Sequence, residues 1–246
     1  MKKLLLMIAL TLISSATFAQ QKKSNMNIQF LKAKMGQKTQ LNDAFETYLS
    51  KFTSVKDGKP QVTGYNILGG NHHAEYLIVY NRRESFADRD VVTPTTMENI
   101  RQQENWEFNV GPHVESVTGD LLVYEPEMSN LGVDDKSEKF VNTEFTVTNN
   151  SKALTDQIRK MPKVWAKLGR KMGVWVTYTG VARYYVVRYL PNGWKELDDA
   201  KDGELAIAYD EVYGKGSWEK DRLILANGWT NTDRFMMTLN KRLTSK

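Results

Sequence analysis

The sequence predicts an α+β fold built from two tandem β-α-β-β-α-β units. Strand-like and helix-like patterns occur in the same order in both halves, and each half contains a glycine-centred hairpin. Residues also match between the halves: Leu41 corresponds to Leu154, and Phe52 corresponds to Trp165. Matches that recur at a spacing of about 110 residues indicate a duplicated unit.

The N-terminus is typical of a secretory signal peptide. A basic start precedes the apolar run Leu4–Ile13, and Thr17–Ala19 supplies small residues for cleavage. The apolar run is shorter than the roughly 20 residues that a membrane-spanning helix needs. We expect residues 1–19 to be removed and residues 20–27 to form a flexible lead-in. The chain would then be exported to the periplasm or the extracellular space.

Composition excludes several function classes. The formal net charge is +5, and acidic and basic residues are interspersed, which is unlike the concentrated basic surface of a nucleic-acid-binding protein. The absence of cysteine removes disulfides, thiolate metal sites and cysteine nucleophiles. No second apolar run reaches membrane-spanning length. We therefore expect no nucleic-acid partner, no membrane span and no metal site.

The first repeat is predicted to begin with a strand over 28–34. Apolar residues at helical spacing then predict an amphipathic helix over 41–55. Strand-like runs at 62–68 and 74–80 flank Gly69-Gly70-Asn71, whose residues readily adopt the positive φ of a tight turn. These elements predict a strand, a helix and a hairpin in succession.

The rest of the first repeat, which we assign to residues 28–125, completes the unit. A short helix is expected over 84–90, and a second helix is expected from Met97 to Trp106. The Gly111-Pro112 break then leads to a strand over 114–124.

The second repeat is assigned to residues 139–246, after an acidic linker over 126–138. It begins with an alternating strand over 140–147 and an amphipathic helix over 154–172. Pro162 lies inside that helix and predicts a break near Met161, because proline cannot donate a backbone hydrogen bond. The remaining expected elements are a hairpin of strands 174–178 and 183–189, helical pieces over 194–218, and a closing strand over 233–239.

A β-α-β-β-α-β unit forms a four-stranded antiparallel sheet with both helices on one face. Two such units can cover each other's bare faces, sheet to sheet. The order of elements, the amphipathic first helix and the hairpin ending in Glu75–Val79 resemble the dimeric α+β barrel superfamily. The resemblance implies two ferredoxin-like units that form an intramolecular barrel. The superfamily includes quinol-type monooxygenases, haem-degrading enzymes and chlorite dismutase-like haem proteins, but the pattern carries no particular activity.

The three histidines all lie in the first repeat, so a single titratable site would lie there. His72 and His73 flank a turn, and we interpret them as solvated turn residues. His113 follows the Gly-Pro break near Trp106 and is the candidate catalytic residue. Haem-binding superfamily members similarly place a histidine after the second helix, so the resemblance makes haem a possible cofactor. A purely structural role for His113 remains open.

Aromatic residues on alternate strand positions would line the space between the two sheets. They would either pack as an ordinary core or form a pocket for a flat apolar ligand. The recurring carboxylates, among them Asp88 and Glu196, we interpret as helix-terminal and solubilising groups rather than acid–base pairs. The candidate ligand-binding residues are Tyr65, Asn66, Tyr76, Trp106, Trp175, Tyr178 and Tyr184.

Three functions are consistent with these patterns. The first is an exported module that binds a small aromatic or amphipathic molecule. The second is a monooxygenase-like or haem-dependent enzyme with one site in the first repeat, where Trp106 and Tyr65 shape a pocket around His113. The third is a structural or interaction protein with a closed core. A cavity without titratable groups would favour the first, and a cavity facing His113 the second. We expect a monomer with pseudo-twofold repeats and leave further association open.

Overall fold

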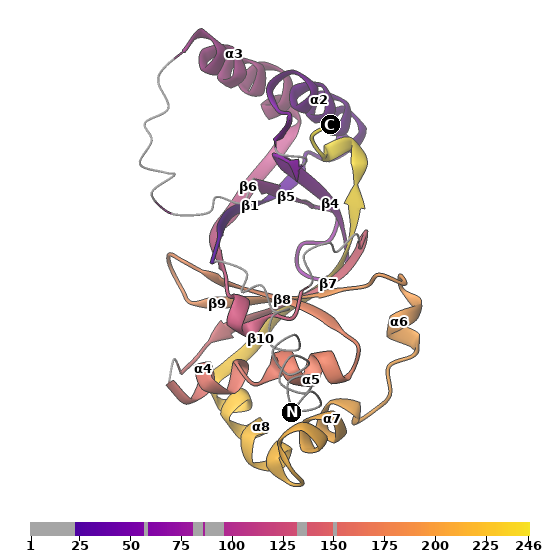
Figure 1. Cartoon of the computed structure of the whole chain (residues 1–246). Coiled ribbons are helices and arrows are strands. Elements are labelled where there is room, and N and C mark those ends of the chain that lie inside the picture. Colours follow the sequence, from indigo (N-terminus) through magenta and orange to yellow (C-terminus); the bar gives the residue numbers. More distant parts are fainter. Residues whose placement is uncertain (1–22, 57–58, 81–85, 87–95, 132–136, 150–151) are drawn as a thin grey trace, which may run out of the picture.

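A computed structural model of the chain describes residues 23–56, 59–80, 86, 96–131, 137–149 and 152–246. Its centre is a closed antiparallel barrel that lies between two groups of helices (Figure 1). The first repeat contributes strands β1 (Asn25–Ala33), β4 (Val62–Leu68), β5 (Tyr76–Tyr80) and β6 (Val114–Tyr124). The second contributes β7 (Lys139–Val147), β8 (Lys171–Thr177), β9 (Arg183–Tyr189) and β10 (Trp229–Asn240). A small separate ribbon pairs β2 (Val55–Lys56) with β3 (Lys59–Pro60).

The strand order confirms the predicted pair of ferredoxin-like units. The first sheet runs β6-β1-β5-β4, and the second runs β10-β7-β9-β8. The two sheets join at both edges, where β4 pairs with β10 and β6 pairs with β8. Each unit's last strand, β6 or β10, thus pairs with an edge strand of the other unit. The barrel therefore closes, and neither sheet leaves a bare face.

The first repeat places its helices on the outer face of its sheet. Helix α2 (Lys38–Phe52) buries Leu41, Phe45 and Leu49, which are members of its predicted apolar stripe. Further along the chain come α3 (Met97–Asn105), the π-helix η2 (Trp106–Val110) and the 3₁₀ turn η3 (Gly111–His113).

The second repeat carries more helical pieces on its outer face (Figure 1). As Pro162 predicts, the first helix is divided into two. The elements are η4 (Pro126–Met128), α4 (Lys152–Ile158), α5 (Met161–Lys167), α6 (Lys195–Asp198), α7 (Glu204–Tyr213) and α8 (Ser217–Gly228). The final 3₁₀ turn, η5 (Lys241–Leu243), packs instead against α2 and β4 of the first repeat. No helix in the described ranges is both long and apolar enough to cross a membrane.

Side chains from all eight strands fill the barrel lumen. The buried set is Met26, Ile28, Phe30, Ile67, Leu77, Leu122, Tyr124, Phe140, Trp175, Tyr185, Val187, Phe235 and Met237. Each sheet also has one further buried cluster, which lies between its outer face and the helices that cover it. The space between the sheets is therefore mainly a packed core.

Some expected boundaries differ from the structure. Strand β1 begins at Asn25, inside the expected lead-in, because Asn25 and Asn27 pair with the end of β6. The short helix expected over 84–90 lies outside the described residues except for Phe86. The C-terminal tail after β10, residues 241–246, packs against the first repeat: Leu243 is buried, and the backbone N–H of Ser245 donates to the Val62 carbonyl at 2.9 Å.

The contact between this tail and β4 leaves no room for a side chain at Gly64. A Cβ atom there would lie 2.4 Å from the Leu243 Cβ and 2.5 Å from the Leu243 carbonyl oxygen. We expect Gly64→Ala to lower the free energy of unfolding by about 1–3 kcal/mol, the usual cost of overpacking. Urea denaturation followed by circular dichroism measures this change. An unchanged midpoint would contradict the close packing of the tail on β4.

Candidate functional site

A cleft opens on the outer face of the first repeat's sheet, beneath α2 and α3. Its volume is about 500 Å³, within the roughly 300–1,000 Å³ range of small-molecule sites. Its floor comes from β5, β1 and β6, and its walls come from α2, α3 and η2. The lining residues are Gln29, Tyr48, Tyr80, Asn99, Gln102, Gln103, Trp106 and Val117.

The cleft exists because α3 does not pack down on the sheet. Its sequence, Met-Glu-Asn-Ile-Arg-Gln-Gln-Glu-Asn, lacks an apolar stripe wide enough to bury, and none of its residues is buried. Met97 is exposed to solvent, and so is Val117 on the sheet below. Within the described part of the chain, the outer face of β6 around Val117 therefore stays uncovered.

The π-helix η2 positions the cleft's tryptophan. A π-turn widens the helix by one residue and is often found at functional sites. Within it, Val110 is buried, while Trp106 packs edge-on against Phe45 and Tyr48 at ring-centroid distances of 5.9 and 5.5 Å. Trp106 is thus held against α2 while still lining the cleft.

The second repeat fills the equivalent space with its own side chains. Trp229 stacks on Phe145 at 4.3 Å, and Trp218 packs against Tyr209 at 5.5 Å. Tyr209 is fully buried in this cluster. The same architecture is therefore closed in one repeat and open in the other.

Hydrogen bonds fix two of the phenols in the cleft. The Tyr80 hydroxyl donates to Gln29 Oε1 at 2.8 Å, and Gln102 Nε2 donates to the Tyr48 hydroxyl at 2.9 Å. The Gln29 amide N–H groups and the Tyr48 hydroxyl proton are not used in these bonds. They can donate to a guest molecule in the cleft.

The described lining is electrically neutral. None of the lining residues is an acid, a histidine, a lysine or an arginine. Burial raises the pKa of both Tyr48 and Tyr80, so the two phenols stay protonated at physiological pH. The described lining residues therefore present aromatic faces and neutral donors and carry no fixed charge.

The seven candidate ligand-binding residues do not meet in one place. Trp106 lines the cleft, whereas Tyr65 and Trp175 pack in the barrel lumen. Tyr76 and Tyr184 belong to the clusters between sheet and helix, on the outer faces of the two sheets.

The other two candidates lie apart from both groups. Tyr178 is exposed in the turn between β8 and β9, and Asn66 accepts a hydrogen bond from Asn240 Nδ2 at 2.9 Å. The expected inter-sheet pocket built from these residues is therefore not formed. The reason is the hairpin register: Tyr65 pairs with Leu77 and faces the lumen, so Tyr76, which pairs with Asn66, faces outward.

His113 lies at the end of η3 beside the start of α2. Its Nδ1 lies 2.9 Å from Gln37 Oε1, and the ring is half-buried. It is not among the residues that line the cleft. The described residues also contain no cluster of three or more potential metal-ligating histidines and carboxylates.

Sequence reasoning missed Gln29, Tyr48 and Tyr80 as site residues. Tyr48 lies within the predicted amphipathic helix over 41–55, and Tyr80 is the last residue of the predicted strand over 74–80. One feature of the sequence could have indicated them. The apolar stripe of α3 is weak, so this helix does not cover the aromatic residues of α2.

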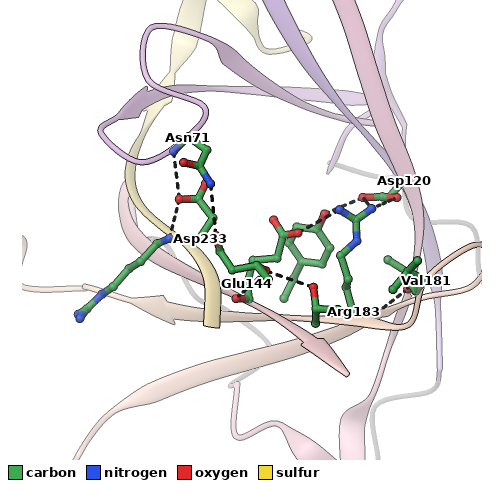
Figure 2. Close-up of polar contacts among 11 residues, drawn as sticks. Asn71, Asp120, Glu144, Val181, Arg183 and Asp233 are labelled. Carbon is green, nitrogen blue, oxygen red and sulfur yellow. Dashed lines mark hydrogen bonds and ion pairs between the residues drawn. The ribbon is translucent and has the colours of Figure 1, made fainter. Parts of the chain in front are cut away.

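A second polar feature lies inside the barrel, at the end where the β4–β5 and β8–β9 hairpins turn. Figure 2 shows Arg183 between two carboxylates from different strands. Its Nη2 donates to both oxygens of Asp120 at 2.8 and 2.9 Å, and its Nη1 donates to Glu144 Oε1 at 3.0 Å. The Tyr185 hydroxyl also donates to Asp120, at 2.6 Å. Because Asp120 belongs to the first repeat and Arg183 to the second, this network joins the repeats.

His72 packs at this same end of the barrel and does not face solvent. Its ring stacks on Phe30 with centroids 3.7 Å apart, and its Nδ1 lies 2.8 Å from Glu75 Oε2. The interpretation of His72 as a solvated turn residue is therefore wrong. The hairpin tip folds into the barrel mouth, which a turn motif in the sequence does not reveal.

Neither a protein-family model nor a curated protein sequence matches this chain. Among solved structures, the chain is similar to an anthrone oxidase-like protein, with a TM-score of 0.54, 8% identity, and coverage of 90% of this chain and 93% of that one. It is also similar to a candidate monooxygenase from Lactobacillus acidophilus NCFM (TM-score 0.48, 9% identity, coverage 92% and 97%). A third is a chlorite dismutase variant from Candidatus Nitrospira defluvii (TM-score 0.49, 9% identity, coverage 89% and 91%). At these identities the likeness shows the fold alone.

Burial raises the pKa of the Glu144 carboxyl, although Arg183 acts in the opposite direction. The folded state therefore holds this proton more tightly than the unfolded state. The resulting stabilisation is present below the unfolded pKa of about 4.3 and is lost as pH rises through the higher folded pKa. We expect the free energy of unfolding of Glu144→Gln, relative to wild type, to increase between about pH 4 and about pH 7.

Urea denaturation at the two pH values measures this difference. Glu127→Gln, at a half-exposed position in η4, serves as the control and should show little change. A difference for Glu144→Gln that stays constant with pH would contradict the effect of burial on Glu144.

Proposed function

We propose that this chain is an exported binding module that holds a small, flat, uncharged molecule in the first-repeat cleft. The observation that carries the proposal is the contrast between the repeats. One sheet–helix interface is filled by its own aromatic rings, whereas the other leaves about 500 Å³ lined by Tyr48, Tyr80 and Trp106. A duplicated fold that keeps one copy closed and one copy open supports a ligand site in the open copy.

The chemistry of the lining defines the ligand. Aromatic faces favour a planar apolar ring, through stacked and edge-on contacts. The spare donors on Gln29 and Tyr48 favour a guest with acceptor oxygens, such as ring carbonyls. A carboxylate or phosphate would lose its hydration without meeting a cation among the described lining residues, and burial of an unpaired charge is costly. The cleft therefore favours neutral guests over anionic ones.

The alternative is a monooxygenase-like enzyme that uses the same cleft. Its support is the fold, which the anthrone oxidase-like structure shares at 8% identity. Acid–base catalysis needs a group with a pKa near the working pH, and the described lining residues offer only phenols with raised pKa. Binding without turnover is therefore the better-supported function.

We test binding by equilibrium dialysis of the purified protein against 1,4-naphthoquinone, a neutral two-ring carbonyl compound. We expect saturable binding of one molecule per chain. Trp106→Leu should weaken it about tenfold, the effect of losing an aromatic contact worth about 1 kcal/mol or slightly more. Phe108→Leu is the matched control: it lies on the same π-helix but is exposed and outside the cleft lining, so it should bind like wild type.

Equal weakening by both substitutions, or no saturable binding, would contradict a site at Trp106. Oxygen uptake measured with 1,4-naphthohydroquinone, the reduced form of the probe that can supply electrons to O2, separates the two functions once the uptake without protein is subtracted. Consumption of oxygen that depends on Trp106 would support the enzyme instead.

A haem titration tests the ligand's charge and the role of His113. Because haem carries two propionates and His113 does not line the cleft, we expect no stoichiometric Soret shift that depends on His113. The measurement compares absorbance spectra of wild type and His113→Ala. A one-to-one Soret shift in wild type that His113→Ala abolishes would overturn the neutral-ligand site in favour of a haem protein.

A further inference from the structure

Strand β6 is paired along one side but incompletely along the other. It pairs with β1 from Val114 to Val123, whereas the described pairing with β8 covers Leu122–Tyr124. Beyond that, the Tyr178 backbone N–H donates to the Leu121 carbonyl at 2.8 Å, so Val117, Gly119 and Leu121 point their backbone groups toward the β8 side. Within the described residues, Val117 and Gly119 therefore present unpaired N–H and C=O groups at an open strand edge.

In the second repeat the equivalent strand is β10, and its edge is covered. The tip of the β4–β5 hairpin lies over the start of β10, where the Asn71 backbone N–H donates to Asp233 Oδ1 at 3.0 Å and Asn71 Nδ2 donates to the Thr232 carbonyl at 3.2 Å (Figure 2). The β8–β9 turn is shorter than the β4–β5 turn and makes no such contact with β6 beyond Leu121. The fold thus protects one of two related edges.

Exposed apolar side chains border the open edge. Val117 is 43% exposed on β6, and Tyr178 and Val181 in the neighbouring β8–β9 turn are 60% and 64% exposed. Phe86, 38% exposed, packs against Tyr178 with ring centroids 4.3 Å apart. An unpaired strand edge beside grouped apolar side chains is a typical site for pairing with another strand.

We propose that this edge docks a second copy of the chain, with the two β6 strands pairing antiparallel about Val117. In that register Val117 faces its own counterpart and Ser116 faces Thr118, while Glu115 lies at the β-bulge where the regular ladder of β6 ends. No like charges face each other, and the serine and threonine hydroxyls can bond across the pair. Glu115 is already paired with Lys32 at 2.7 Å, so its charge is compensated. The strand is therefore complementary to itself.

Pairing of the two β6 strands would also enlarge the cleft. The cleft floor runs from β5 through β1 to β6 and stops at the open edge. The second copy's β6 continues this floor, so each copy extends the other's cleft. The association itself does not depend on the proposed ligand, and its test reads a different property.

Sedimentation velocity of the purified protein tests the association, and we expect a dimer. Val117→Lys and Val117→Glu should each sediment as monomers, because each places two like charges opposite one another across the pair. An equimolar mixture of the two variants should restore the dimer, because opposite charges then face each other. Met236→Lys, at a similarly exposed outward-facing strand position (39%), should remain dimeric.

A wild-type monomer would overturn the proposal. So would a dimer that persists in both Val117 variants, or a mixture of the two that stays monomeric. Circular dichroism of each variant confirms that it is folded, which separates lost pairing from lost structure.

Discussion

The rest of the structure depends on the pairing of strand edges between the two repeats. Each four-stranded sheet has one face against helices and one bare apolar face, and the bare faces are buried only when the sheets curve together. Pairing of β4 with β10 and of β6 with β8 closes that arrangement. Because both units belong to one chain, closure needs no second molecule. The Asp120–Arg183 pair adds a charge-assisted contact across the same boundary.

Closure of the barrel does not require the two repeats to stay alike on their outer faces. Once the lumen is packed, each sheet–helix interface can change separately, since it contributes little to the pairing of the edges. The second repeat uses this freedom to stack Trp229 and Phe145 and to bury Tyr209. The first repeat instead leaves α3 without buried residues and keeps a neutral aromatic cleft beneath it. The proposed ligand site in the first repeat follows from this difference.

The periodic features of the sequence predicted the architecture, because strand and helix order, the tandem repeat and the break at Pro162 are local signals. Which face a residue occupies depends on hairpin register, so Tyr65 and Tyr76 could not be assigned to opposite faces in advance. The position of His72 could not be predicted for a related reason, because its stacking on Phe30 joins a turn to a strand that is distant in the sequence. The cleft arises because α3 does not pack against the sheet. In the sequence, the only sign of this is the weak apolar stripe of α3.

The most direct test is a crystal structure of the protein soaked with 1,4-naphthoquinone. Ligand density between Trp106 and Tyr80, with none between Trp218 and the second repeat's sheet, is the expected result. It would show that the open repeat binds and the closed repeat does not. Density in the barrel lumen or in the second repeat, or an α3 packed onto β6 so that the cleft is filled, would contradict the functional difference between the repeats.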